Sequence, residues 1–250
     1  MMTGLKDQIR TRWSLDAANY NRSTQSTWNS ERAKSSWKSI FKDLLGTEDQ
    51  LVLDIGTGPG FVAFLLAELE KKVIGIDLSE DMIQIANRNS SDLGFNVDFR
   101  VGDAENLPFE DESFDAVVNR YVLWTLPNPE RAMHEWRRVL KPGGILIIID
   151  GNWSHNYKNS IYKKLWRYFA APIVVVTEKR IPCKTKLDQS IKQKLWSSGN
   201  SRPSTDTEIL KKLGFRNVEA DLNINKRTQS LLDYIKLGYW GDTFLVTGIK

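Results

Sequence analysis

From Gln50 onward, short apolar runs alternate with longer amphipathic stretches. This rhythm is typical of a parallel sheet whose strands are joined by helices that cover both of its faces. Five apolar runs have the length and composition of buried strands, and they span residues 51–56, 72–77, 97–103, 114–119 and 144–150. The pattern therefore predicts an α/β fold.

Two of the intervening stretches have a clear helical period. Apolar residues between 61 and 70 recur on one face of a helix, and those between 129 and 140 do the same. Pro142 and the glycine pair that begins at Gly143 are typical helix breakers, so we expect the second helix to end there.

The rhythm breaks at Gly151, after the fifth run. An amphipathic stretch near residues 160–176 predicts a helix that ends at Pro172. A helix at 206–214, a strand at 215–222 and a last strand at 242–250 complete the pattern.

We accordingly expect one domain over residues 1–250. Its expected parts are a helical cap at 1–45, a core at 46–150 and 205–250, and an insertion at 151–204.

Charge is unevenly distributed along the chain. The net charge is +4 overall, but residues 152–203 alone carry +9, so the remainder carries −5. Such asymmetry indicates an anionic partner, which would be nucleic acid, a phosphorylated compound or a membrane surface, or else simply a solvated lysine-rich face.

The single cysteine, Cys183, excludes an internal disulfide framework and a cysteine-based metal cluster, and it fits a reducing cytoplasm. We expect no metal. No apolar run approaches the length that spans a bilayer, and the first residues do not have the pattern of a signal peptide.

The most informative segment joins the first predicted strand to its helix through Gly56, Gly58 and Gly60. Glycines at such a turn let the backbone approach a ligand and present helix N-terminal amides to it. Asp77 ends the second strand, where a carboxylate can accept both hydroxyl groups of a ribose. A dinucleotide fingerprint would require glycine at position 61, and Phe61 there argues against NAD.

A third signal follows the third strand. Asp103 is placed to accept a hydrogen bond from an adenine amino group, and the backbone amide of Ala104 to donate one to the ring.

In order and spacing, the segments LDIGTGPG, IDLSEDM, VGDAENLPFEDESFDAVV and RVLKPGG resemble the class I methyltransferases that use S-adenosylmethionine (AdoMet). The branch most similar in style contains the ubiquinone and menaquinone biosynthesis methyltransferases. The resemblance implies a Rossmann-like, seven-stranded, mostly parallel sheet with an antiparallel last strand. It also implies an enzyme that converts AdoMet to S-adenosylhomocysteine.

The resemblance further implies a set of cofactor-binding residues. Gly56 and Gly58 would flank the methionine moiety, supported by Asp54, with the backbone of Asn119 nearby. The other implied contacts are Asp77 on the ribose, Leu78 and Met82 on the adenine faces, Asp103 and Ala104 on the adenine edge, and Tyr20 in a segment folded over the cofactor.

Methyl transfer from a sulfonium needs alignment and exclusion of water more than a strong base. Two residues are candidate bases: His155, in the loop after the fifth strand, and Tyr121, just past the fourth. His134 shares its helix face with charged residues and is interpreted as a surface residue. An Asn-Pro-Pro-Tyr type tetrapeptide would mark methylation of an amino group in adenine or glutamine. Residues 119–122 read NRYV at the corresponding place, which argues against those subgroups.

We expect a small organic acceptor, aromatic or anionic, that approaches through the basic insertion. A weak contact with a membrane surface is compatible with its amphipathic stretch, whereas a nucleic-acid recognition module is not evident. An RNA or protein methyltransferase and a catalytically silent AdoMet-binding partner subunit remain as alternatives.

Overall fold

The computed structural model describes residues 2–151, 161–179, 189–237 and 243–250. Its centre is one seven-stranded sheet in the order β3-β2-β1-β4-β5-β7-β6. The strands are β1 (Leu51–Ile55), β2 (Lys72–Asp77), β3 (Asp98–Val101), β4 (Phe114–Arg120), β5 (Leu140–Gly151), β6 (Arg216–Asp221) and β7 (Thr243–Ile249). Only β7 runs antiparallel to its neighbours. The predicted seven-stranded, mostly parallel sheet is therefore confirmed.

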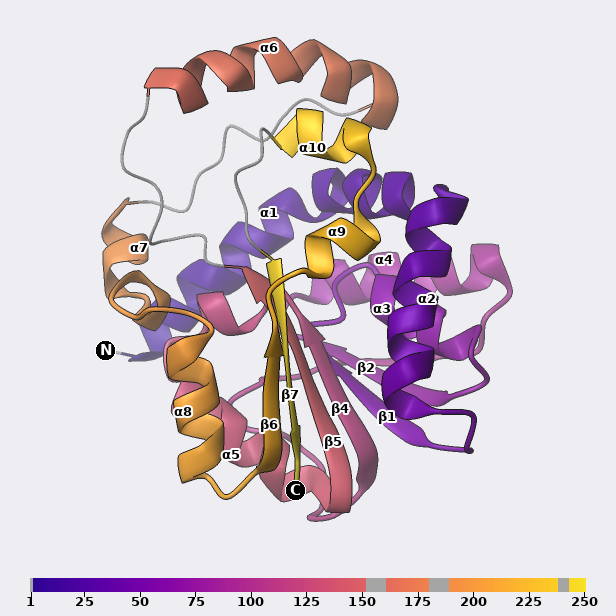
Figure 1. Ribbon diagram of the computed structural model, residues 1–250, viewed down its shortest axis with the longest axis vertical. Coiled ribbons are helices and arrows are strands. Elements are labelled where there is room, and N and C mark those ends of the chain that lie inside the picture. The colour runs from indigo at the N-terminus through magenta and orange to yellow at the C-terminus, as the bar shows by residue number, and fades with distance from the viewer. Residues whose placement is uncertain (1, 152–160, 180–188, 238–242) are drawn as a thin grey trace.

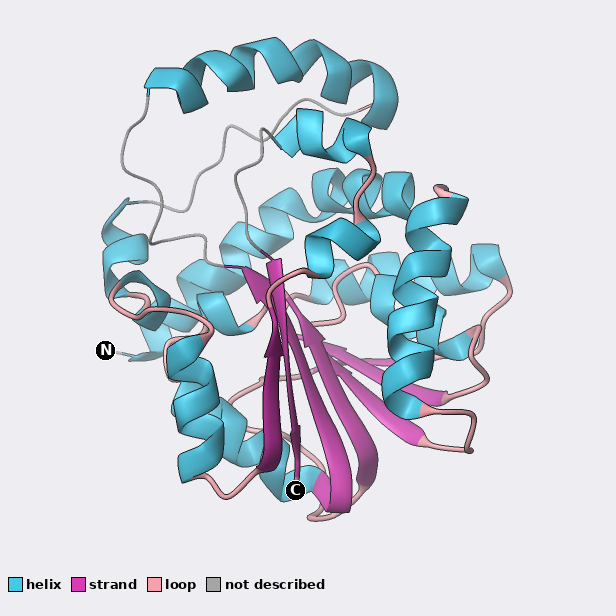
Figure 2. Ribbon diagram, viewed as in Figure 1, coloured by secondary structure: helices cyan, strands magenta, loops and turns pink. Residues whose placement is uncertain are grey.

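Helices cover both faces of this sheet and also cross the edge at which the parallel strands end (Figure 1). They are α1 (Met2–Trp28), α2 (Glu31–Leu45), α3 (Phe61–Ala67), α4 (Glu80–Leu93), α5 (Pro129–Val139), α6 (Ile161–Glu178), α7 (Gln189–Lys194), α8 (Ser204–Lys212), α9 (Ile224–Thr228) and α10 (Leu231–Leu237). Helices α2, α3 and α4 lie on one face, and α5 and α8 lie on the other (Figure 2).

The strands are apolar on both sides because both faces are covered. In β4, Ala116 and Val118 belong to the core beneath α2 and α3, whereas Val117 packs into the core beneath α5. A parallel strand buried in this way has a continuous apolar run rather than an alternating one, which is why the sequence located these strands well.

Two helix ends differ from the expected ones. Helix α5 ends at Val139, and β5 begins at Leu140, so the residues from Pro142 to Gly144 belong to the strand rather than to a helix stop. Helix α6 continues through Pro172 to Glu178. The prediction that it ends at Pro172 is wrong, because neighbouring structure can hold a helix together across the hydrogen bond that proline removes.

A buried ion cluster ties the C-terminal part of the chain to the sheet. The guanidinium of Arg202 contacts the carboxylate of Asp150, at the end of β5, at 2.9 Å and that of Asp206, in α8, at 2.7 Å. All three side chains are fully buried, and Asp150 also accepts the backbone N–H of Trp124 at 2.9 Å. Breaking one member would leave an uncompensated buried charge, so this cluster fixes α8 against the carboxyl end of β5.

Within the described part of the chain, no helix combines the length and hydropathy needed to cross a bilayer.

Candidate active site

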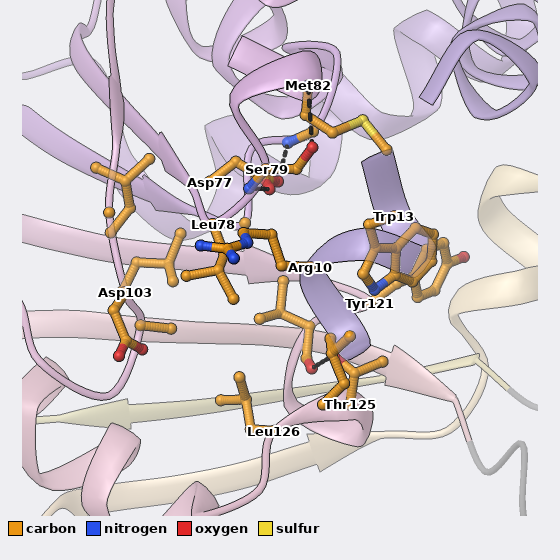
Figure 3. Close-up of a pocket in the computed structure, with 18 of the residues that line it drawn as sticks. Arg10, Trp13, Asp77, Leu78, Ser79, Met82, Asp103, Tyr121, Thr125 and Leu126 are labelled. Carbon is orange, nitrogen blue, oxygen red and sulfur yellow. Dashed lines mark hydrogen bonds between the residues drawn. The ribbon is translucent and has the colours of Figure 1, made fainter. Parts of the chain in front are cut away.

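A pocket opens at the carboxyl ends of β1, β2 and β4, beneath α1 (Figures 1 and 3). With its open mouth it encloses about 780 Å³, a size typical of small-molecule sites. This location follows the rule for open α/β sheets, in which ligands bind outside the carboxyl ends of the strands where the strand order reverses.

The glycine turn after β1 forms the floor of the pocket. Gly56 and Gly58 have φ values of +65° and +55°, in the left-handed region that glycine adopts without strain. A Cβ on Gly56 would lie 2.2 Å from Cγ2 of Val122, and one on Gly58 would lie 3.5 Å from the Tyr20 ring. Both the conformation and the space therefore require glycine at position 56.

Asp77 holds this floor in place at the end of β2. Its Oδ2 accepts the backbone N–H of Gly58 at 3.0 Å, and its Oδ1 accepts that of Ser79 at 2.9 Å. Burial raises the pKa of Asp77 to about 6, against the lowering effect of these hydrogen bonds. Each oxygen keeps a second lone pair for a ligand hydroxyl, and Figure 3 shows the carboxylate beside Ser79 and Leu78.

Asp54 lies behind the same turn and is 1% exposed. Its Oδ2 accepts the hydroxyl of Thr57 at 2.7 Å, and the backbone N–H of Ala63 donates to the carboxylate. Burial raises the pKa of Asp54 to about 7. The residue thus supports the turn, as the resemblance implies, and also borders a small compartment that continues from the main pocket.

Asp103 lies at the opposite end of the pocket, past β3. Its Oδ1 accepts the N–H of Glu105 at 2.9 Å, and its Oδ2 forms an ion pair with Lys6 of α1 at 2.6 Å. Lys6 also contacts Glu105 at 2.7 Å. These two carboxylates raise the pKa of Lys6 against the opposing effect of burial, and they anchor the first turns of α1 over this end.

Apolar and aromatic side chains form the walls between these polar groups. Leu78 and Met82 follow β2, and Ala104 follows β3; all three line the pocket as the resemblance implies. Trp13 of α1 lies on the opposite side from Leu126, as Figure 3 shows.

The end of β4 contributes Asn119, Arg120 and Tyr121. Asn119 is fully buried within the strand, and its side-chain amide has no hydrogen-bond partner among the described residues; it does not line the pocket. Arg120 and Tyr121, which follow it, do. Tyr121 has a φ of +63°, a conformation that costs a non-glycine residue free energy and recurs at functional sites.

The Arg120 guanidinium lies 4.6 Å from the ring centroids of Phe61 and Tyr121 and 5.4 Å from that of Trp37. Its Nε is buried without a hydrogen-bond partner among the described residues, and no described carboxylate lies within ion-pair distance of it. Asp54 and Arg120 border the same small compartment, which Gly56 and Tyr20 also line. A carboxylate and a guanidinium thus share one compartment without bonding to each other.

Helix α1 closes the remaining side. Trp13 packs edge-on against Tyr20 at 5.6 Å and against Trp124 at 6.5 Å between ring centroids. The hydroxyl groups of Ser14 and Ser79 lie 2.8 Å apart. Tyr20 is half-buried over the glycine turn, and desolvation raises the pKa of its phenol.

Comparison with known proteins agrees with this architecture. Residues 53–148 match the model of the family described as "Methyltransferase domain". A demethylmenaquinone methyltransferase of Chlorobaculum parvum is 32% identical over 187 residues, which cover 73% of this chain and 72% of that protein. The chain belongs to the class I AdoMet-dependent methyltransferases.

Other relatives match a smaller share of this methyltransferase. An uncharacterized methyltransferase of Bacillus subtilis, YcgJ, is 37% identical over 40% of each chain. For several curated relatives the match spans only 36% to 51% of their length. In fold, the methyltransferase superposes with a TM-score of 0.63 on a Methanococcus maripaludis protein assigned to the AdoMet-dependent methyltransferases. That match has 21% identity and covers 95% of this chain and 93% of that one.

The structure brings together most of the residues that the sequence singled out. Nine line the main pocket: Tyr20, Gly56, Gly58, Asp77, Leu78, Met82, Asp103, Ala104 and Tyr121. Asp54 borders the adjoining compartment, and Asn119 is fully buried within β4. His155 and Cys183 lie outside the described residues.

Sequence reasoning missed Arg120 and Trp13. A cation at the end of an apolar strand, at the carboxyl edge of a parallel sheet, is the signal that would have identified Arg120. Trp13 gave no comparable signal, because its position over the pocket depends on how α1 packs.

Proposed function

We propose that this methyltransferase transfers the methyl group of AdoMet to a small organic acceptor and releases S-adenosylhomocysteine. The observation that carries the proposal is the order of chemical groups along the pocket and the small compartment that adjoins it. An adenine-reading carboxylate, a ribose-binding carboxylate and a pair of opposite charges follow one another from Asp103 through Asp77 to Asp54 and Arg120.

The adenosine half of the pocket has the required donors and acceptors. Asp77 would accept the two ribose hydroxyls on the lone pairs that Gly58 and Ser79 leave available. Asp103 would accept the adenine amino group, with Leu78 and Met82 against the ring faces. Lys6 forms ion pairs with both Asp103 and Glu105 and offsets one of their two negative charges at this end.

The other half has the charges of an amino acid. A methionine moiety carries one ammonium and one carboxylate, and the compartment beside Gly56 offers Asp54 and Arg120. Arg120 would bind the carboxylate, because its guanidinium lacks an anionic partner among the described residues and can form two parallel hydrogen bonds to one. Asp54 and the backbone of the glycine turn would receive the ammonium group.

When bound, AdoMet supplies a methyl group already activated by the sulfonium. The residues around it therefore need to align the acceptor and exclude water. Trp13, Tyr20 and Tyr121 surround this region with aromatic rings, which favour a cation on their faces and keep solvent out. Tyr121 remains our candidate for accepting or relaying a proton, and His155 is retained as a second candidate.

The acceptor would enter between α1 and residues 151–204, which we assign as the acceptor-side insertion. The aromatic walls of the pocket and the net positive charge of the insertion favour an aromatic or anionic molecule. The relatives named demethylmenaquinone methyltransferase make a ring-containing acceptor the first class to screen.

The test has two stages. Calorimetric titration with S-adenosylhomocysteine, beside NADH on the same preparation, should give micromolar binding of the former alone. Incubation with AdoMet and a panel of aromatic and anionic acceptors should then release S-adenosylhomocysteine above the acceptor-free rate. Turnover only with RNA or protein would replace the acceptor class. Binding without turnover on any acceptor would favour a silent AdoMet-binding subunit.

A further inference from the structure

Helix α6 carries an exposed apolar face of unusual size. Five of the eleven large hydrophobic side chains exposed among the described residues belong to this helix, and Tyr168, Phe169 and Val176 are 81%, 73% and 77% exposed. Leu165 and Val175 are the other two. A contiguous apolar surface of this kind marks an interaction site more often than an accident of sequence.

The exposed residues share one side of the helix. Their spacing, from Leu165 through Tyr168 and Phe169 to Val175 and Val176, is that of a single stripe about 17 Å long at 1.5 Å per residue. The stripe therefore runs along most of the helix rather than ending at Pro172.

The opposite side of α6 is already occupied. Ala170 and Val174 are buried against the body of the protein, and the indole N–H of Trp166 donates to the carbonyl of Ile235 in α10 at 2.7 Å. The helix is thus fixed with its second apolar face outward, at the outermost edge of the molecule (Figure 1). Leu231 and Leu232 of the neighbouring α10 are exposed as well.

Charge selects the partner of this face. The sequence of α6 holds Lys163, Lys164 and Arg167 and no acidic residue before Glu178. It lies within the segment 152–203, whose net charge is +9. A second copy docking face to face would bring two such segments together, whereas an anionic surface would neutralise them.

We infer that α6 docks this protein on the surface of a bilayer rich in anionic phospholipid. The apolar stripe enters the boundary between headgroups and acyl chains, and the basic residues of the insertion contact the lipid phosphates. This mode needs no transmembrane segment. It also does not depend on the proposed methyl transfer.

Vesicle co-sedimentation tests the inference with the intact protein. One set of vesicles is phosphatidylcholine alone, and the other contains about one third phosphatidylglycerol. We expect at least tenfold stronger partitioning onto the anionic vesicles, and a steep loss of binding as salt is raised. Equal partitioning onto both sets, or none onto either, would overturn the inference.

The variant Phe169→Glu places a charge in the middle of the stripe, and Leu93→Glu, on the 42% exposed Leu93 of α4, is the matched control. We expect Phe169→Glu to lower vesicle binding at least tenfold and Leu93→Glu to leave it within twofold. Thermal midpoints and S-adenosylhomocysteine binding should be unchanged, since both sites are exposed and outside the pocket. A wild-type dimer in solution that Phe169→Glu dissociates, without vesicle binding, would assign the face to a second copy instead.

Discussion

The two ends of the pocket are built in different ways. The end that we propose for adenosine uses Asp77, the last residue of β2, and residues that directly follow β2 and β3, so each group is fixed by its strand. The methionine end combines Tyr20 of α1, Asp54 of β1 and Arg120 of β4, which are far apart along the chain. Helix α1 contacts both ends, through Lys6 on Asp103 at the first and through Tyr20 at the second, but only the second end joins groups from three distant segments of the chain.

The two ends of the pocket therefore differ in how rigidly their residues are held. Strand ends in a buried sheet share the stability of the core, whereas α1 lies over the pocket with few fully buried side chains and is joined to it by contacts such as Lys6 to Asp103 and Ser14 to Ser79. We expect variants at the adenosine end to lower the affinity for every adenosine-containing ligand. Variants at the methionine end should lower the affinity only for ligands that carry the amino-acid group. Four variants or conditions test that division.

The largest effect is expected for Asp77→Ala. It removes the proposed acceptor of both ribose hydroxyls and the hydrogen bonds that the carboxylate accepts from the backbone N–H groups of Gly58 and Ser79. Charge-assisted hydrogen bonds contribute about 1.5–3 kcal/mol each, so affinity for S-adenosylhomocysteine should fall at least about 100-fold by calorimetry. Asp49→Ala, at an exposed surface pair, is the control and should bind normally. A folded Asp77→Ala protein that binds S-adenosylhomocysteine within threefold of the wild-type affinity would refute the assignment of Asp77 to the ribose.

Arg120→Met should have the next largest effect, confined to the methionine end. Loss of one charged bidentate contact should weaken S-adenosylhomocysteine binding about 10- to 100-fold. Binding of 5′-methylthioadenosine, which lacks the amino-acid group, should be nearly unchanged. Arg216→Met, at an exposed arginine of β6, serves as the control. Equal losses for both ligands would show that Arg120 acts only by holding the turn and the rings together.

The third test is pH. Burial raises the pKa of Asp77 to about 6, and the ribose hydroxyls bind its ionised form. Affinity for S-adenosylhomocysteine should therefore fall as pH drops below about 6, by about tenfold per pH unit. Asp77→Asn should abolish this dependence, and a flat wild-type profile down to about pH 5 would contradict it.

The same carboxylates give the free energy of unfolding a pH dependence opposite in direction to that of the cofactor affinity. Asp77 and Asp54 have pKa values of about 6 and about 7 in the folded protein, against 3.8 ordinarily. The folded state then binds more protons than the unfolded state between these values. The free energy of unfolding of the ligand-free protein should therefore decrease as pH rises from about 4 to about 7.

The smallest effect is expected for Lys6→Met. Lys6 and Asp103 are partly exposed, and the buried Glu105 keeps its hydrogen bond from the Asn128 N–H, so loss of Lys6 should weaken binding only about two- to fivefold at low salt, and less at high salt. Lys72→Met, at a lysine that is 71% exposed, is the control for charge removal. A loss as large as that of Asp77→Ala would mean that α1 contributes far more to the adenosine end than we infer.

Sequence patterns predicted the strands of the sheet, and with them the place of the residues that end or follow β2 and β3, because both depend on local signals in the chain. Buried strands have continuous apolar runs, and the residues after them fall at one edge by topology alone. The path of α6 through Pro172 was not predictable, since it depends on contacts such as that of Trp166 with α10. Arg120 was missed for a related reason: its environment comes from Phe61 and Trp37, on other elements.

The small number of buried side chains in α1 has a thermodynamic consequence. Along this 27-residue helix, only Ile9, Ala17 and Thr24 are buried among the residues whose side chains are described, one for about every two turns. A helix so lightly buried opens locally at a lower free-energy cost than the sheet. A ligand that touches both Tyr20 and Asp77 joins α1 to the core, so any measured cofactor affinity includes the free energy of ordering this helix. By reciprocity, the helix is most firmly ordered when the cofactor is bound.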